Sequence, residues 1–283
     1  MRLILAELRK LNRPLTWGVA AAVALFCVLL AIGGASNTNK NQRSAARPES
    51  TLQVAAQLHP LGAGAEAAGL MASMPGALAL ALMAGGHVGG EWSGRTMKQL
   101  LTQEGRRTRV IAAKLISLWV AGIGMIAVSW IALAIAGPVI SHAASLPPNA
   151  MSATDALEWS ASQSGRALLV VAVFASIGLL AAVLTRNTIG TMAGAAGAVL
   201  AMLVAASLPS LGSATPATWV QGWMGFAAGT RSISTLPNNF WSRFIDSSGA
   251  APGHAAGGFA LVVLVGVCVA TAALIFRRTD VVG

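Results

Sequence analysis

The chain has few side chains that could perform acid–base, nucleophilic or metal chemistry, and they do not form a catalytic pattern. Its four histidines lie on separate segments: His59, His87, His142 and His254. No HExxH, GxSxG or glycine-rich phosphate-binding motif occurs. Both cysteines lie inside apolar runs, where a free thiol behaves as a small hydrophobe. We therefore expect no catalytic residue, no metal site and no cofactor bound by this chain.

Two polar features near residue 90 have alternative interpretations. His87 could contact a substrate within a membrane span, or it could hydrogen-bond to a neighbouring helix, which we favour, because a buried polar group needs a partner in either case. Glu91 and Lys114 could pair with each other, or each could extend separately to the membrane interface. The carboxylates otherwise lie at expected span ends or in loops, which disfavours ion-coupled transport.

A polar, cationic segment, residues 91–101, separates two long apolar runs. Four residues share one side of its helical wheel: Ser93, Met97, Leu100 and Leu101. The opposite side is polar: Arg95, Lys98 and Gln99. This spacing predicts a short amphipathic helix over 92–101. Because it lies between two spans and basic residues follow it, we expect this helix on the cytoplasmic surface with its polar face toward the cytosol.

The composition is that of an integral membrane protein. Charged residues make up 10% of the 283 residues, against roughly 25% in soluble domains. Apolar runs near the spanning length of about 20 residues recur along the chain. We expect one all-α transmembrane domain over 1–283, with six spans at about 15–33, 70–90, 110–137, 165–184, 188–208 and 257–276.

The segments between the spans have distinct characters. Residues 1–14 are expected to form a basic amphipathic elbow helix in the interface, with Met1, Ile4, Leu5, Leu8 and Leu11 on its apolar side. Residues 36–69 and 138–164 are expected to be outer loops, the first with a short helix near 51–58. The cytoplasmic segment 91–109 follows span two, and a long outer segment, 209–256, follows span five.

Two further patterns concern helix packing and the membrane interface. Small residues at Gly190, Gly194 and Ala198 allow close helix packing, within one chain or between two subunits. Trp219, Trp223 and Phe226 share one helical face. They could form an outer substrate gate or an aromatic belt, on a helix that lies in the interface or re-enters the membrane.

The distribution of basic residues predicts the orientation. Six spans place both termini on one side. Of the 19 Lys and Arg residues, the segments on that side hold about two thirds. By the positive-inside rule these segments, and both termini, are cytoplasmic. The topology thus accounts for the net charge of +10, and no nucleic-acid partner is expected.

The chain resembles the permease subunit of a type-2 ATP-binding cassette exporter (the ABC-2 family). The resemblance is strongest over residues 91–115. Here Glu91 and Trp92 are followed by Arg95-Thr96, Lys98 and Leu100-Leu101, similar to a family pattern of Glu, an aromatic, Gly-Thr, a basic residue and paired Leu. Arg95 stands where the family usually has glycine. The basic elbow helix and the long outer segment between spans five and six also match.

The resemblance implies a mechanism. The permease would dimerise, with an identical or paralogous copy, in a bacterial plasma membrane, and would recruit two separate cytosolic ABC ATPase subunits that bind ATP and Mg. The helix at 92–101 would be the coupling helix docked on the ATPase, and the turn at Arg186 a second, smaller contact. The docking residues implied are Glu91, Trp92, Arg95, Thr96, Lys98, Gln99 and Arg186. No Walker motif occurs in the chain, as a stand-alone permease should show.

Two other classes of function are compatible with the sequence. One is a membrane scaffold or immunity protein that performs no transport. The other is a secondary transporter, which the lack of mid-span acidic residues disfavours. Co-purification of a soluble ATPase would favour the permease over both.

Overall fold

The computed structural model describes residues 2–42, 54–103, 106–147, 151–206, 208, 214–225 and 252–278. All regular structure within these ranges is helical, which confirms the all-α prediction. The helices are α1 (Arg2–Lys10), α2 (Pro14–Gln42), α4 (Ala63–Met71), α5 (Met74–Ala84), the π-helical turn η1 (Gly85–Gly89), α6 (Gly90–Ser93), α7 (Thr96–Gln103), α8 (Arg107–Ala143), α9 (Ala153–Thr185), α10 (Thr188–Ala206), α11 (Pro216–Met224) and α13 (His254–Arg278).

Five helices are long and apolar enough to cross a membrane: α2, α8, α9, α10 and α13. A sixth span results if α4 and the helical stretch from Met74 to Ser93, which meet at a bend of 62°, are counted together. The protein is therefore a multi-pass membrane protein, with five or six spans by this criterion.

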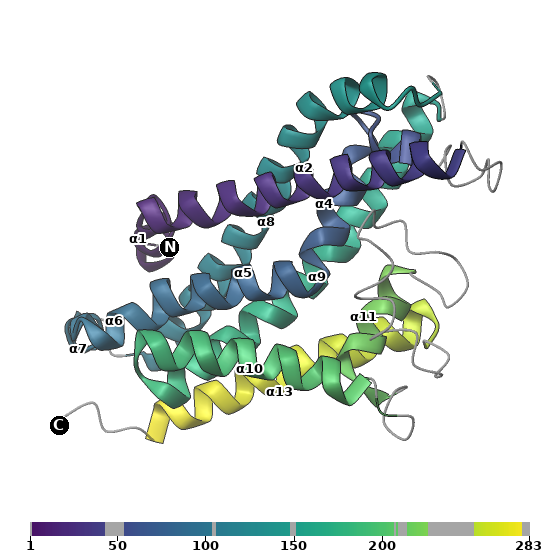
Figure 1. Ribbon diagram of the computed structural model, residues 1–283. Coiled ribbons are helices and arrows are strands. Elements are labelled where there is room, and N and C mark those ends of the chain that lie inside the picture. The colour runs from purple at the N-terminus through teal and green to yellow at the C-terminus, as the bar shows by residue number, and fades with distance from the viewer. Residues whose placement is uncertain are drawn as a thin grey trace.

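The long helices lie side by side between two ends of the molecule (Figure 1). One end, here called the α6–α7 end, holds α1, α6, α7, the turn between α9 and α10, and the last residues of α13. The opposite end, here called the α11 end, holds α11. Helix α1 is seen almost end-on while α2 crosses the view, so α1 lies across the bundle rather than along it.

Helix α9 is the central helix of the bundle, because it packs against α4, α8, α10 and α13. Its buried residues are mostly small or β-branched, for example Ala167, Val170 and Val171, which lets neighbouring helices approach closely. The peripheral helices instead expose large apolar side chains such as Ile189 on α10 and Phe259 on α13. In a membrane protein these exposed side chains can face lipid without the penalty they would have in water.

The second span is broken, where the sequence had predicted a continuous segment over 70–90. Pro75 lacks a backbone N–H, and its ring excludes the carbonyl of Met71, so α4 cannot continue into α5. The hydroxyl of Ser73 donates to the carbonyl of Leu70 at 2.5 Å and closes the end of α4. Almost all of α4 is buried, so the expectation of an outer loop extending through residue 69 is wrong over this helix.

The other expected outer loop, 138–164, is also largely helical. Helix α8 continues through Pro138 to Ala143, and α9 begins at Ala153. The hydroxyl of Ser152 accepts a hydrogen bond from the N–H of Asp155 and caps the first turn of α9. The expected span ends were set where the sequence becomes polar. Helices α8 and α9 continue beyond those points into the polar residues. For the same reason α2 continues past residue 36 to Gln42.

In the long segment 209–256, the described residues contain the short helix α11 and the first residues of α13, which begins at His254. The hydroxyl of Thr215 accepts from the N–H of Thr218 at its start, and Gly225 ends it with φ of +77°. Helix α11 packs on α13 through glycines, since a Cβ at Gly257 would lie 2.7 Å from the carbonyl oxygen of Trp219. Residues 226–251, which include Phe226, lie outside the described part of the chain.

Candidate functional site

The cationic segment between the second and third spans forms two short helices rather than the single helix expected over 92–101. Helix α6 ends at Ser93, Arg95 adopts a left-handed conformation with φ of 56°, and α7 starts at Thr96. Gly94 weakens the helix at this point because glycine is a poor helix former. The hydroxyl of Thr96 donates to the carbonyl of Glu91 at 3.3 Å and supports the turn.

Helix α7 is amphipathic as the sequence predicted. Met97 is buried, and Leu100 and Leu101 pack against the core. Arg95, Thr96 and Gln99 are exposed. Lys98 lies on α7, but its side chain is outside the described part of the structure. The segment therefore has an exposed polar side, while the apolar residues on its other side pack against the protein.

Trp92 joins three parts of the α6–α7 end. Its ring meets that of Phe276 on α13 edge-to-face, with the ring centroids 5.9 Å apart and the planes at 89°. The guanidinium carbon of Arg186 lies 5.9 Å from the centroid of the Trp92 ring. Arg186 is exposed and occupies the left-handed turn between α9 and α10. The two patches that the sequence placed separately, residues 91–99 and Arg186, are thus in contact.

Helix α6 is also fastened to the start of α10. The backbone N–H of Thr188 donates to the hydroxyl of Ser93 at 3.0 Å, and the two side-chain hydroxyls lie 3.1 Å apart. Ser93 therefore caps α10 from another helix. Behind it, a Cβ at Gly89 would lie 2.6 Å from the Thr191 hydroxyl oxygen and 2.9 Å from the carbonyl oxygen of Asn187. Only glycine allows η1 to lie this close to α10.

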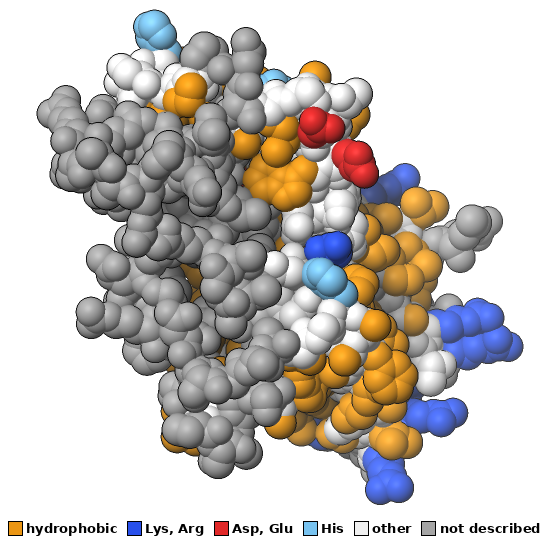
Figure 2. Space-filling model, turned by 90° about the vertical axis from the view of Figure 1, so that its right-hand side faces the viewer, with side chains coloured by type: hydrophobic (Ala, Val, Ile, Leu, Met, Phe, Trp, Pro, Cys, Tyr) orange, Lys and Arg blue, Asp and Glu red, His pale blue; other side chains and the backbone are white. Residues whose placement is uncertain are grey.

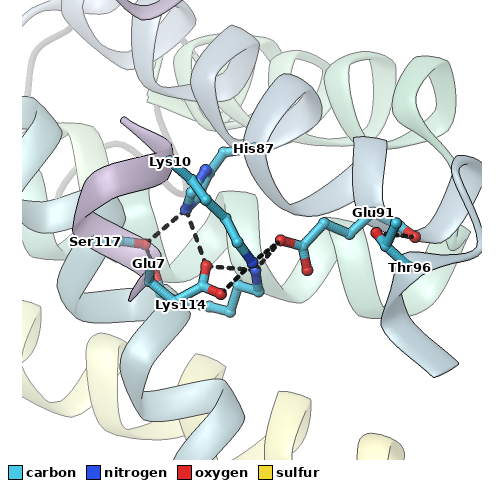
Figure 3. Close-up of polar contacts among 7 residues, drawn as sticks. All are labelled: Glu7, Lys10, His87, Glu91, Thr96, Lys114 and Ser117. Carbon is cyan, nitrogen blue, oxygen red and sulfur yellow. Dashed lines mark hydrogen bonds and ion pairs between the residues drawn. The ribbon is translucent and has the colours of Figure 1, made fainter. Parts of the chain in front are cut away.

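Four charged side chains meet beside α6, and we call them the buried charge cluster: Glu7, Lys10, Glu91 and Lys114 (Figure 3). Lys114 Nζ lies 2.6 Å from Glu91 Oε1 and 2.5 Å from Glu7 Oε2. Lys10 Nζ lies 2.7 Å from Glu91 Oε1 and 2.6 Å from Glu7 Oε1. The Glu91–Lys114 pair, one of the two alternatives read from the sequence, is confirmed. Each lysine bridges the two carboxylates, so the cluster ties α1, α6 and α8 together.

His87 extends the buried charge cluster. Its Nε2 lies 2.9 Å from the hydroxyl oxygen of Ser117 and 3.3 Å from Glu7 Oε2. Because the Ser117 hydroxyl donates to the carbonyl of Lys114, its oxygen must accept from His87. The proton is therefore on Nε2, which also faces the Glu7 carboxylate. The interpretation of His87 as a histidine hydrogen-bonded to a neighbouring helix is confirmed.

The electrostatics of the cluster are balanced, with two carboxylates and two ammonium groups. The side chains of Glu7 and Lys114 are each only 1% exposed. Burial alone would raise the pKa of Glu7, but the His87 hydrogen bond and the charges and hydrogen bonds of Lys114 and Lys10 outweigh it and hold that pKa well below its ordinary value. Burial would lower the pKa of Lys10, but Glu7 and Glu91 outweigh it and raise that pKa. The ionised forms of Glu7 and Lys10 are therefore favoured.

Sequence reasoning missed Glu7. The sequence placed Leu5 on the apolar side of this helix, which was expected to lie in the membrane interface. In the structure Leu3, Glu7 and Leu11 face the protein, and Leu5 is 56% exposed. The spacing of these inward residues, i, i+4 and i+8, is helical, and the lone acid in a basic helix was the available signal. Helix α1 thus packs on charged groups as well as apolar ones, which the apolar pattern alone does not indicate.

The small-residue stripe on α10 makes only limited contacts within the chain. A Cβ at Gly190 would lie 2.8 Å from Thr185 Cβ in the adjacent turn, but at Gly194 only ordinary contacts with Ala181 and Thr185 would result. Gly194 is exposed, and Ala198 is half-buried. The residues that bury α10 in the bundle are instead Thr191, Ala195, Val199 and Ala206.

The aromatic residues of α11 are anchored at the α11 end. The indole N–H of Trp223 donates to the carbonyl of Arg166 on α9 at 2.8 Å. Gly258 on α13 approaches the Trp223 ring closely, since a Cβ there would lie 2.5 Å from its Cε3. Trp219 packs against the same core, and both tryptophans are half-buried.

The described ranges contain no group of three or more His, Cys, Asp or Glu side chains that could hold a metal ion. What the α6–α7 end offers is an exposed polar surface on α7 and Arg186, supported by interlocking contacts to α1, α8, α10 and α13.

The fold defines a helical, multi-pass membrane protein. Residues 3–281 match the family model for ABC-2 family transporter proteins. The chain therefore belongs to this family of membrane proteins, whose members generally work with ABC ATPases. No match was found among curated protein sequences.

Proposed function

We propose that this chain is the permease subunit of an ATP-driven exporter in a bacterial plasma membrane. It forms the translocation path as a dimer and is powered by two separate cytosolic ATPase subunits, which supply the ATP and Mg sites. The observation that carries the proposal is the exposed polar surface of the α6–α7 segment and Arg186, which is supported by contacts to α1, α8, α10 and α13. Family membership supports the same conclusion.

The docking surface consists of the exposed residues of this end. Arg95, Thr96 and Gln99 are accessible on the α6–α7 segment, and Arg186 lies over Trp92 of the same segment. Lys98 belongs to the same stretch of α7 and completes the proposed set. Glu91 is buried and Trp92 half-buried, so in this proposal they support the surface from beneath. An ATPase that binds α7 would therefore also contact the α9–α10 turn.

A push on this surface can reach the membrane helices. Ser93 caps α10, and glycines place η1 directly against it. The π-helical turn that connects α5 to α6 departs from regular helix geometry, as such turns often do at functional sites. Movement of α6 by the ATPase therefore displaces the start of α10 and, through η1, the second span. We infer that these two spans change the translocation path.

The charge distribution supports a cytosolic α6–α7 end. Exposed basic residues gather there: Arg9, Arg13, Arg95, Arg106, Arg109, Arg186, Arg277 and Arg278. At the α11 end the first turns of α9 expose Asp155 and Glu158. Figure 2 shows acidic side chains on the described surface of that end, next to hydrophobic ones. Basic residues concentrate on the cytoplasmic side of membrane proteins, so both termini lie in the cytosol in this proposal.

A second permease copy has a suitable contact surface on α10. Gly194 and Gly197 are exposed on this helix, and a Cβ at Gly197 would meet nothing within 4 Å in the chain. Small residues at exposed positions of a membrane helix let a second helix approach closely. We propose this face of α10 as part of the dimer contact.

The proposal is tested by purifying the tagged chain in mild detergent and identifying bound proteins by mass spectrometry. The expected result is a stoichiometric subunit that carries Walker motifs and hydrolyses ATP. Reversing two charges on the docking surface, Arg95→Glu with Lys98→Glu, should release this subunit while the permease still inserts. A matched double reversal at the other end, Asp155→Lys with Glu158→Lys, should not. Retention of the ATPase by the first variant would refute the docking surface.

A further inference from the structure

We infer that Glu7 and Lys10 are positioning residues that make α1 part of the moving unit: when the ATPase displaces α6, the buried charge cluster carries α1 with it. The inference rests on the proposed function and assigns a mechanical role to a helix that composition alone places passively in the membrane interface.

The geometry of the carboxylates identifies Glu7 as the centre of the cluster. Both of its oxygens are occupied, Oε1 by Lys10 and Oε2 by Lys114 and His87. Glu91 is held through Oε1 alone, and its Oε2 is buried without a hydrogen-bond partner among the described residues. Removal of Glu7 would therefore break more interactions than removal of Glu91.

The two lysines make it unfavourable for α1 and α6 to move apart. Lys10 comes from α1 and Lys114 from α8, yet each bridges Glu7 and Glu91. If α6 moved away alone, Glu91 would leave both ammonium groups, and the remaining three charges would no longer balance. An uncompensated buried charge is strongly unfavourable. Joint movement of α1, α6 and the part of α8 that carries Lys114 keeps all four groups paired.

The rest of α1 does not oppose such a movement. Leu5, Ala6 and Arg9 are exposed on the side away from the protein. Among the described residues, the α1 side chains contact other helices through the cluster and through apolar packing of Leu3 and Leu11. Across the described residues, the charged contacts thus dominate how α1 is attached.

Hydrogen-exchange mass spectrometry of the permease–ATPase complex in nanodiscs tests the inference. Exchange is compared with and without Mg and the non-hydrolysable analogue AMP-PNP. In the unaltered complex, nucleotide should change exchange in residues 96–103 and also in residues 2–10. If residues 96–103 do not respond, the proposed function fails. If they respond and residues 2–10 do not, the proposed function stands and this inference is overturned.

Variants distinguish loss of the movement of α1 from a general loss of protein stability. The double variant Glu7→Gln with Lys10→Met removes both charged groups of α1 from the cluster and leaves Glu91 paired with Lys114. In it the response of residues 96–103 should persist and that of residues 2–10 should be lost. The double variant Glu7→Gln with Lys114→Met is also charge-balanced but keeps the pair between Lys10 and Glu91, so it should retain the response of α1. Persistence of the α1 response in the first double variant would overturn the inference. Arg9→Gln, on the exposed side of α1, should respond as the unaltered protein does.

Discussion

Arg186 lies over the ring of Trp92, although the two residues belong to the α9–α10 turn and to the segment between the second and third spans. The same indole meets Phe276 near the end of α13 edge-to-face. One half-buried side chain thus brings together three segments that are distant in the chain. A partner that binds this end therefore contacts one surface formed by three segments. A displacement of any one segment changes the packing of Trp92 and so affects the other two.

The contact between Trp92 and Arg186 is expected to contribute measurably to stability. Trp92→Ala should lower the free energy of unfolding by about 2–4 kcal/mol, because the packing on Phe276 is lost as well. Arg186→Gln should cost only about 0.5–1 kcal/mol, the size of an exposed cation–π contact. Thermal unfolding of the single and double variants in detergent gives the coupling between them. Strict additivity of the two losses would contradict the contact.

Lys114 is expected to be among the most sensitive positions in the protein. Lys114→Met leaves two buried carboxylates with Lys10 alone, and breaking a buried pair in this way costs about 3–5 kcal/mol. Lys10→Met should cost less, because the Lys10 side chain is 29% exposed and water can compensate. The melting temperatures of the two variants in the same detergent compare these losses. Equal melting temperatures would show that burial does not set the strength of these pairs.

The buried charge cluster also predicts a pH dependence. The pKa of Glu7 is below its ordinary value of 4.5, so its stabilisation is complete above about pH 4.5 and is lost as pH falls through the lower, folded-state pKa. The pKa of Lys10 is above 10.5, so its contribution is complete below that pH and is lost as pH rises further. The melting-temperature difference between the unaltered protein and Glu7→Gln should thus be constant from roughly pH 5 to 9 and shrink in stronger acid. A difference that already shrinks at pH 6 would contradict the lowered pKa.

Gly89 is expected to be essential for the contact between η1 and α10. Gly89→Ala would place a methyl group against the carbonyl of Asn187 and the hydroxyl of Thr191, so the helices must shift, at a cost of about 1–3 kcal/mol. Gly124→Ala is the matched control, because a Cβ there meets nothing within 4 Å. The control should be neutral or slightly stabilising, since alanine favours helix. Thermal unfolding of both variants decides the matter; equal effects would mean that η1 tolerates more room than its contacts indicate.

Arg95 occupies a conformation that favours glycine. A left-handed residue other than glycine carries strain of about 1–2 kcal/mol, so Arg95→Gly should not lower the melting temperature despite the loss of a charged side chain. Arg95→Val should lower it, because a β-branched residue tolerates φ of 56° poorly. Arg95→Gly also provides a folded variant in which ATPase binding can be measured without the arginine side chain. A clear loss of stability in Arg95→Gly would show that its side-chain contacts outweigh the strain.

Local patterns predicted part of this site and long-range contacts completed it. The period of α7 correctly placed Met97 inward and Gln99 outward, because that arrangement depends only on neighbouring residues. The broken second span was signalled by Pro75, but the continuous hydropathy of the surrounding residues outweighed it. The contacts of Arg186 with Trp92 and of Glu7 with Lys114 depend on how distant helices pack, which no local pattern contains.

The distances along the chain between the members of the buried charge cluster have a consequence for biogenesis. Residues 2–10 are synthesised well before Lys114, which follows only after two hydrophobic segments. Until then Lys10 is the only one of the two lysines that can pair with Glu7, so the second carboxylate oxygen of Glu7 must stay hydrated. We therefore expect α1 to reach its final position only after the segment that carries Lys114 has been inserted.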